Sequence, residues 1–337
     1  MKYSIAYNFD KKLISYYRKI NTKKDFIFQV FFSSQNGYLG SGRYRGLPNN
    51  SLKKTGGHFK YLKGKVETNY LLNSSYCPDL RNKENLKNLM DYLFWVYSQK
   101  PSIVTVANKK VLTLLKDNFP DLPVNISIIM AVKTVKQVNQ LRRAFPNIKR
   151  ITLHQKVNRD KDLLVKHVKN ANRKTNNMDP IEIELLANEI CIYNCPLMKR
   201  HYFDIGAEHF GKSICSIDFF LNFCPKKRAS DPIHFLNSCF IRPEDVVFYE
   251  GIGIHILKLS GREASSNYLK LVSKAYLKRK YSGNVMDLFD SLFWPEGKVP
   301  FMDNRNLDSF LKYLWEKSLK KLRYIPKKYY SSWKYNQ

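Results

Sequence analysis

The 337-residue sequence is short of acidic residues, of cysteine and of long apolar runs. Its 28 Asp and Glu stand against 58 Lys and Arg, which leaves a formal net charge of +30. Six cysteines are too few for a disulfide scaffold of this length, and no apolar signal region follows Met1 and Lys2. No window approaches the roughly 18 apolar residues that a membrane helix needs. We therefore expect a protein of the reducing cytoplasm without a membrane span.

Glycine is also scarce, and 14 glycines leave room for only one glycine cluster, at residues 37–46. This segment contains Arg43 and Arg45, so its backbone N–H groups could cradle an anion. A surface loop is the alternative. No Gly-Lys-Ser/Thr ending and no dinucleotide-binding fingerprint is present, which excludes both nucleotide motifs. We find no internal repeat.

What the sequence does contain is enough apolar material for a packed core. Hydrophobic residues make up 44% and aromatic residues 14% of the chain, which excludes a disordered polycation.

The charge is concentrated at the ends: residues 1–65 hold 14 basic and two acidic side chains, and residues 312–337 hold eight basic and one acidic side chain. Cations near aromatic rings suit an unpaired RNA or DNA strand, whereas a solvated surface in a Lys-, Asn- and Tyr-rich chain is the alternative. The rings and cations of the C-terminal end are Tyr313, Trp315, Tyr324, Tyr329, Tyr330, Trp333, Tyr335, Lys320, Lys321, Arg323, Lys327, Lys328 and Lys334.

Short β-branched runs alternate with amphipathic stretches of helical length. The expected strands are residues 3–6, 26–32, 102–106, 124–128, 149–153, 181–187, 235–241 and 253–257. The expected helices are residues 109–117, 135–145, 161–172, 243–249 and 264–276. This order predicts an α/β fold, a TIM-like (β/α)₈ barrel with basic N- and C-terminal extensions, with an open doubly wound sheet as the alternative. We place the barrel at residues 1–285 and a basic aromatic C-terminal extension at residues 286–337.

Five of the six cysteines fall within 49 residues: Cys191, Cys195, Cys215, Cys224 and Cys239. Clustered thiolates in a cytosolic protein indicate zinc or iron–sulfur ligation, because soft sulfur suits both. Cys191 and Cys195 are four residues apart and follow an expected strand, at the end where barrels build their sites. Cys239 lies in an apolar run and is better interpreted as a small buried hydrophobe. The residues alone do not separate zinc from an iron–sulfur cluster.

A set of short motifs in consistent order resembles peptidase family U-32, the collagenase-like family. These are Asn188-Glu189-x-Cys191-x₃-Cys195-Pro196 with His201-Tyr202, Cys224-x₃-Arg228-x₃-Pro232, Ile241-Arg-Pro-Glu-Asp245 with Tyr249-Glu250, Lys258-Leu-Ser-Gly261-Arg262, Asn69-Tyr-Leu-Leu-Asn73 before Cys77, and Asn158-Arg159. Where an arginine often follows the Cys-Pro pair in the family, this chain has Met198. The chain therefore looks like a divergent member.

The resemblance implies a TIM-like barrel that holds a [4Fe-4S] cluster. By this resemblance Cys191 and Cys195 are paired ligands, Cys224 is a third, and Cys77 is our choice for the fourth, with Cys215 next. It also implies relatives that are oxygen-independent hydroxylases of ubiquinone synthesis or of RNA bases, with prephenate as oxygen donor. Some relatives work in pairs, so a protein partner is possible.

Three classes of function follow from these observations. The first is an iron–sulfur enzyme that hydroxylates or otherwise modifies an RNA base, in which Glu189, His201, Arg242 and Arg262 orient donor or substrate. Each of these four side chains also has a structural interpretation as a cap, loop partner or strand-end cation. The second class is a peptide hydrolase, although no Gly-x-Ser-x-Gly or His-Glu-x-x-His motif is present. The third is a non-catalytic iron–sulfur or zinc scaffold, and a small-molecule or peptide substrate also stays open.

Overall fold

Eight parallel strands close into a single barrel in the computed structural model of the chain, which describes residues 1–42, 49–175, 178–317 and 324–335. The strands follow one another around the barrel in sequence order, and β8 pairs with β1. They are β1 (Lys2–Ala6), β2 (Phe26–Phe32), β3 (Glu67–Leu72), β4 (Ile103–Val106), β5 (Val124–Ile126), β6 (Ile148–Thr152), β7 (Glu182–Leu186) and β8 (Ile256–Leu259). The predicted (β/α)₈ barrel is confirmed, and the open sheet is excluded.

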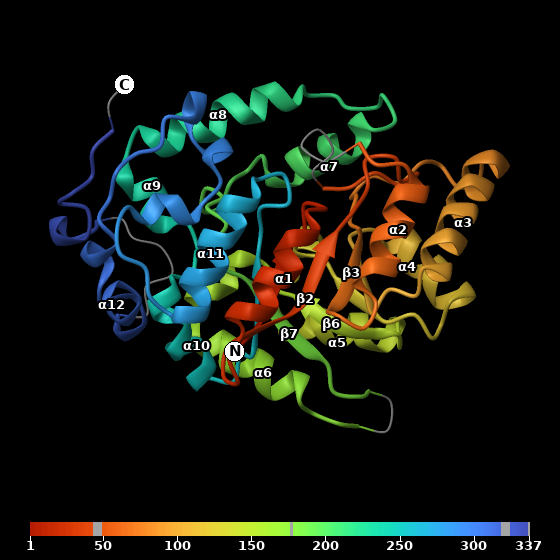
Figure 1. Cartoon of the computed structure of the whole chain (residues 1–337), viewed down its shortest axis with the longest axis horizontal. Helices are drawn as coiled ribbons and strands as arrows, with labels where there is room; N and C mark the ends of the chain where they lie inside the picture. The colour runs from red at the N-terminus through yellow and green to blue at the C-terminus, as the bar shows by residue number, and fades with distance from the viewer. Residues whose placement is uncertain (43–48, 176–177, 318–323, 336–337) are drawn as a thin grey trace.

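Helices connect successive strands and cover the outside of the barrel (Figure 1). They are α1 (Lys11–Ile20), α2 (Leu52–Leu62), α3 (Lys83–Ser98), α4 (Lys109–Asn118), α5 (Val135–Ala144), α6 (Lys161–Ala171), α7 (Met198–Glu208), α8 (Ile217–Ala229), α9 (Pro232–Asn237), α10 (Val246–Gly251), α11 (Ser266–Lys278) and α12 (Phe310–Glu316). All five helices expected from the sequence are present. The connection between β7 and β8 is the long one, because it carries α7 to α10.

The prediction of a strand at residues 235–241 is wrong. The strand that brings the barrel to eight is β3, which was not among the expected strands. Residues 232–237 form α9, because the Asp231 carboxylate accepts the Ile233 N–H at the helix start and Pro232 occupies the first turn. β3 escaped detection because its centre is Thr68 and Asn69 rather than an apolar run.

Polar side chains fill much of the barrel interior, where branched apolar residues are usual. Asn69 donates to Gln29 Oε1 at 3.2 Å, and Arg150 donates to the same oxygen at 2.9 Å. The Thr152 hydroxyl donates to Glu184 Oε1 at 2.6 Å, and Asn125 donates to that oxygen at 3.3 Å. This network accounts for the polar centre of β3, because a side chain that faces the barrel axis meets hydrogen-bonding partners there.

The basic N-terminal region is built into the barrel and is not an extension of it. Residues 1–65 contain β1, α1, β2 and α2, and β1 is the strand that closes the barrel against β8. The strands bury their apolar residues, and the lysines of α1 and α2 occupy exposed helix positions. Seven of the 14 basic residues of this stretch lie on these two helices. Arg43 and Arg45 lie outside the described residues.

The C-terminal region packs as a second hydrophobic core beside the barrel, around α9 and α11 (Figure 1). Phe235, Trp294, Phe310 and Tyr329 are buried in this core. The other rings that we considered for base stacking, Tyr313, Trp315, Tyr330, Trp333 and Tyr335, are partly buried against it, and Tyr324 is exposed. Lys320, Lys321 and Arg323 lie outside the described residues. The boundary between residues 285 and 286 stays a prediction.

Across the described ranges, no helix has both the length and the apolar character needed to cross a membrane.

Candidate functional site

Three of the cysteines line one cavity of about 310 Å³. Cys191 and Cys195 come from the loop that follows β7, and Cys224 comes from α8. The walls of this cysteine cavity also include Phe220, Phe293 and the His201 ring. The cavity therefore gathers thiols that the sequence separates by up to 33 positions, within a mostly apolar enclosure.

The loop after β7 turns tightly so that Cys195 stands at the start of α7. Asn194 adopts the left-handed conformation with φ of 56°, which asparagine tolerates better than most residues. The Cys195 N–H donates to the Ile192 carbonyl at 3.1 Å, and α7 begins three residues later. The free N–H groups at a helix start favour negative charge on a nearby atom. The position of Cys195 just before α7 therefore favours a negative charge on its sulfur.

Cys195 and Cys224 form a hydrogen-bonded pair. A hydrogen bond from the Cys224 thiol, with further ones from the backbone N–H groups of Leu197 and Met198, lowers the pKa of Cys195 to about 6. The hydrogen bond to Cys195 and burial raise the pKa of Cys224. Of the two, Cys195 is therefore the one that more readily becomes a thiolate, which is the form that binds metal.

A buried arginine lines the same cavity as the three cysteines. Arg228 is 2% exposed, and it donates to the Ile190 carbonyl at 3.0 Å and to the Phe293 carbonyl at 3.2 and 2.5 Å. Its guanidinium also interacts electrostatically with all three cysteine sulfurs and with Glu189. Arg228 thus supplies positive charge where negative sulfur would accumulate, and it ties the cysteine loop to the C-terminal region.

The remaining cysteines occupy other surroundings. Cys77 lies in the loop after β3, near Tyr38 and Lys110, and burial raises its pKa to about 11. Cys215 interacts with Arg200 just before α8. Cys239 is buried, as expected of a small hydrophobe. Among the residues that the structure describes, no three His, Cys, Asp or Glu side chains are already set for metal binding, so the whole ligand set, including the three cavity cysteines, stays a prediction.

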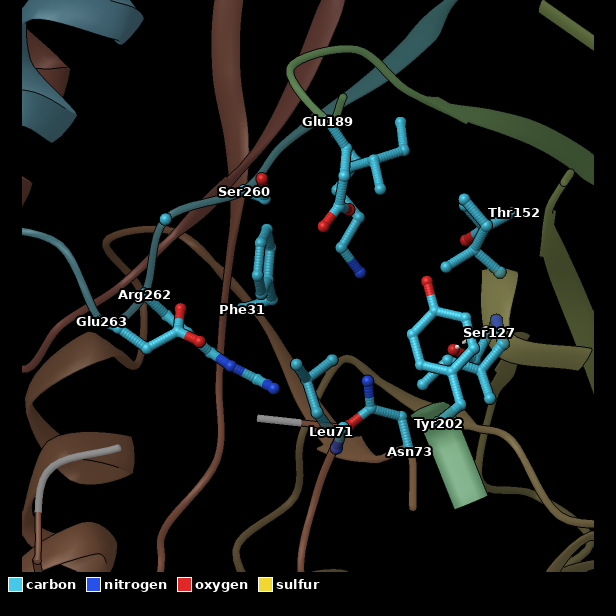
Figure 2. A pocket seen from close by; sticks show the side chains of 16 residues that line it. Phe31, Leu71, Asn73, Ser127, Thr152, Glu189, Tyr202, Ser260, Arg262 and Glu263 are labelled. Atoms are coloured by element: carbon cyan, nitrogen blue, oxygen red, sulfur yellow. Dashed lines mark hydrogen bonds between the residues drawn. The ribbon is translucent and has the colours of Figure 1, made fainter. Parts of the chain in front are cut away.

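A second cavity opens at the mouth of the barrel (Figure 2). Arg262 and Glu263 lie on one side of this barrel-mouth cavity, Glu189 points into it from above, and Tyr202 projects from the far side. Lys258 of β8 also lines it. The cysteine cavity and the barrel-mouth cavity adjoin, because both are lined by the same four residues: Tyr202, Ser260, Gly261 and Glu263.

Three of the four predicted orienting residues line the two cavities. Glu189 and Arg262 line the barrel-mouth cavity, and His201 lines the cysteine cavity, where its ring stacks on Phe220 at 4.4 Å between centroids. Arg262 is held by hydrogen bonds to the Ser33 and Ser41 hydroxyls at 3.2 and 3.4 Å.

Arg242 lies outside both linings. It donates to the Asn304 carbonyl at 2.8 Å and to Asp308 at 3.0 Å, which ties the C-terminal region to the barrel.

Two residues of the site were not singled out from the sequence, although both belong to the quoted motifs. Arg228 follows Cys224 by four residues, the spacing that places two side chains on one face of a helix. Lys258 lies in the C-terminal part of the last strand, where barrel sites form. The spacing from Cys224 could have identified Arg228, and the position in the last strand could have identified Lys258.

The chain is 31% identical over 238 residues to the uncharacterized protease MJ1657 of Methanocaldococcus jannaschii, a match that covers 69% of this chain and 67% of that protein. The solved structure of the U32 peptidase Mk0906 has the same fold, with a TM-score of 0.51 at 13% identity, over 77% of this chain and 92% of that one. The chain belongs to the U32 peptidase family. The resemblance that the motifs suggested is thereby confirmed. No family model matches this U32 protein.

Proposed function

We propose that this U32 protein is an iron–sulfur enzyme that modifies an RNA base, by oxygen-independent hydroxylation or a related reaction. The observation that carries the proposal is the meeting of Cys191, Cys195 and Cys224 in one cavity that adjoins a polar, cationic cavity. The first cavity suits a redox centre and the second suits an anionic donor such as prephenate.

The cysteine cavity fits a [4Fe-4S] cluster in three respects. Three thiols line it, hydrogen bonds from the Leu197 and Met198 N–H groups favour the Cys195 thiolate, and the Arg228 guanidinium offsets negative charge. Cys77 or Cys215 would supply the fourth thiolate, as the family resemblance implies. A bound cluster would supply electrons or an open iron to the reaction. The surrounding Phe220 and Phe293 limit the access of water to it.

The residues of the barrel-mouth cavity would hold the donor. Lys258 and Arg262 can each pair with a carboxylate, and Arg262 is held in place by Ser33 and Ser41. Glu189 and the Tyr202 hydroxyl can exchange protons with a bound molecule. Tyr202 also lines the cysteine cavity, so a donor here would lie next to the redox centre.

Support for an RNA substrate is the excess of basic residues, with a formal net charge of +30. The packed C-terminal rings favour contacts from exposed lysines to phosphates over stacking on bases, because most of those rings are committed to the second core. Two observations test this substrate. Retention of RNA should weaken as salt is raised, and the nucleosides of a deletion strain should lack one modification by mass spectrometry. Salt-independent retention, or an unchanged nucleoside profile, would count against RNA.

Iron content after anaerobic reconstitution tests the cluster. We expect iron and sulfide to be lost from the Cys191→Ser, Cys195→Ser and Cys224→Ser variants, and from either Cys77→Ser or Cys215→Ser. Cys239→Ser is the matched control, because this cysteine is buried away from the cavity and should leave the iron unchanged. Stoichiometric zinc without iron, or full iron in a Cys191→Ser and Cys195→Ser double variant, would overturn the assignment.

The similar protein MJ1657 is named a protease, which favours a peptidase as the second candidate. A cysteine peptidase needs a thiolate and an oriented histidine, and Cys195 and His201 line one cavity. Peptide cleavage by metal-free protein that is blocked by thiol reagents would support this activity. An absence of cleavage under those conditions would exclude the peptidase activity.

A further inference from the structure

Lys258 is an unusual occupant of the barrel interior, because its ammonium lacks a hydrogen bond within the described residues. Its side chain is 12% exposed, and Nζ lies 4.2 Å from the centre of the Phe31 ring. Its nearest charged partner is Glu184 Oε1 at 4.0 Å. That carboxylate oxygen already accepts hydrogen bonds from Thr152 and Asn125. These two contacts therefore position the amine without a hydrogen bond, and the amine lines the barrel-mouth cavity.

The surroundings make the charged form of this amine less favourable than it is in water. Burial lowers the pKa of Lys258; Arg262 and Arg150 lower it further, whereas Glu184 and Glu189 act in the opposite direction. A desolvated lysine beside other cations is a nucleophile suited to carbonyl compounds. Arg262 lines the same cavity and points into it (Figure 2). A carbonyl-seeking amine and a carboxylate-binding guanidinium therefore lie in one enclosure.

We propose that Lys258 captures the carbonyl group of a 2-oxo carboxylic acid as an imine, with the acid's carboxylate bound by Arg262. The Nζ lone pair attacks the carbonyl carbon, and a C–N bond forms while the carbonyl oxygen takes a proton. The resulting carbinolamine loses water as the C–O bond breaks, and the nitrogen gives up its remaining proton or stays protonated as the iminium. No oxidant or reductant is consumed.

The proton donors and acceptors for these steps stand on the cavity wall. Glu189 and Tyr202 project into the cavity from different sides (Figure 2), so one group can protonate the departing oxygen while the other receives a proton. The imine needs neither the cysteines nor a cluster. This activity therefore goes beyond the proposed function and can stand or fall separately from it.

Borohydride trapping tests the proposal on the full-length protein without reconstitution. The protein is incubated with pyruvate and sodium borohydride, and the adduct is located by peptide mass spectrometry. Reduction of the imine should add the mass of the acid less one oxygen atom, and Lys258 should be the major modified residue. Acetone, which lacks a carboxylate, should label Lys258 less than pyruvate does.

Two variants sharpen the result. Lys258→Met should lose the adduct, whereas Lys133→Arg should keep it. Lys133 is the matched control, because burial also lowers its pKa but it does not line the cavity. The site is mapped in the wild-type chain, so the outcome does not depend on the folding of a variant. Labelling that is spread over surface lysines, or that matches Lys133, would overturn the proposal whatever the iron content of the protein.

Discussion

Arg228 offers the sharpest test of how the cysteine site is held together. We consider Arg228→Met, which keeps most of the side-chain volume and removes the charge and every donor. The change deprives the carbonyls of Ile190 and Phe293 of their hydrogen bonds in a buried setting. Hydrogen bonds from a charged donor contribute about 1.5–3 kcal/mol each, so the loss at two carbonyls should lower the free energy of unfolding by about 3–6 kcal/mol.

The same substitution should remove the iron of the proposed cluster, because Arg228 is a buried cation that interacts with all three cavity cysteines. Arg142→Met is the matched control. Arg142 is also buried and donates to three carbonyls, those of Asn170, Arg173 and Asp179, but near α6 and far along the chain from the cysteines. It should lose comparable stability and keep its iron.

Urea unfolding and iron analysis of the two reconstituted variants separate these effects. Arg228→Lys provides an intermediate case, because a single ammonium keeps the charge but does not reproduce the two-carbonyl fork. The reasoning would be refuted if Arg228→Met unfolded like the wild type. It would also be refuted if Arg142→Met lost as much iron as Arg228→Met, since a general loss of stability would then explain both.

The remaining predictions concern the barrel and its edges. The hydrogen bond from Arg279 lowers the pKa of Glu250 from 4.5 to about 2. Glu250 therefore stabilises the fold above pH 4.5, and this contribution is lost as the pH falls from 4.5 toward 2; the difference in stability between Glu250→Gln and wild type should shrink over that interval in acid-unfolding curves. Gly206→Ala should destabilise the fold by about 1–3 kcal/mol, because its Cβ would lie 2.4 Å from the Ser74 hydroxyl. Gly57→Ala meets nothing within 4 Å inside α2 and should stabilise by about 0.5–1 kcal/mol in the same denaturation assay; equal effects at the two glycines would contradict the packing argument.

The two cavities of this U32 barrel take their polar groups from different segments of the chain. Cys191, Cys195 and Cys224 come from the long β7–β8 connection, whereas Lys258 and Arg262 come from β8 and the loop after it. The cysteines proposed as cluster ligands and the cations proposed to bind an anion therefore belong to separate segments of the chain. Substitutions in one set can be tested without removing the other.

Much of the fold could be predicted because its signals are local. Alternating β-branched runs and amphipathic helices depend on short-range periodicity, and seven of the eight expected strands are present. The exceptions have local physical causes. Asp231 and Pro232 start a helix where apolar residues suggested a strand, and Asn69 faces a polar barrel interior that no short window shows.

The sequence by itself determined the barrel, the pairing of Cys191 with Cys195 and the concentration of positive charge, because each depends on spacing or composition. The other features of the site depend on contacts between segments that are distant in the sequence. Only the tertiary structure brought Cys224 and Arg228 onto the cysteine loop, buried the C-terminal rings, and placed Lys258 beside Arg262 at the barrel mouth. These groups come from distant segments, and the contacts between such segments depend on how strands and helices pack and not on any pattern along the chain.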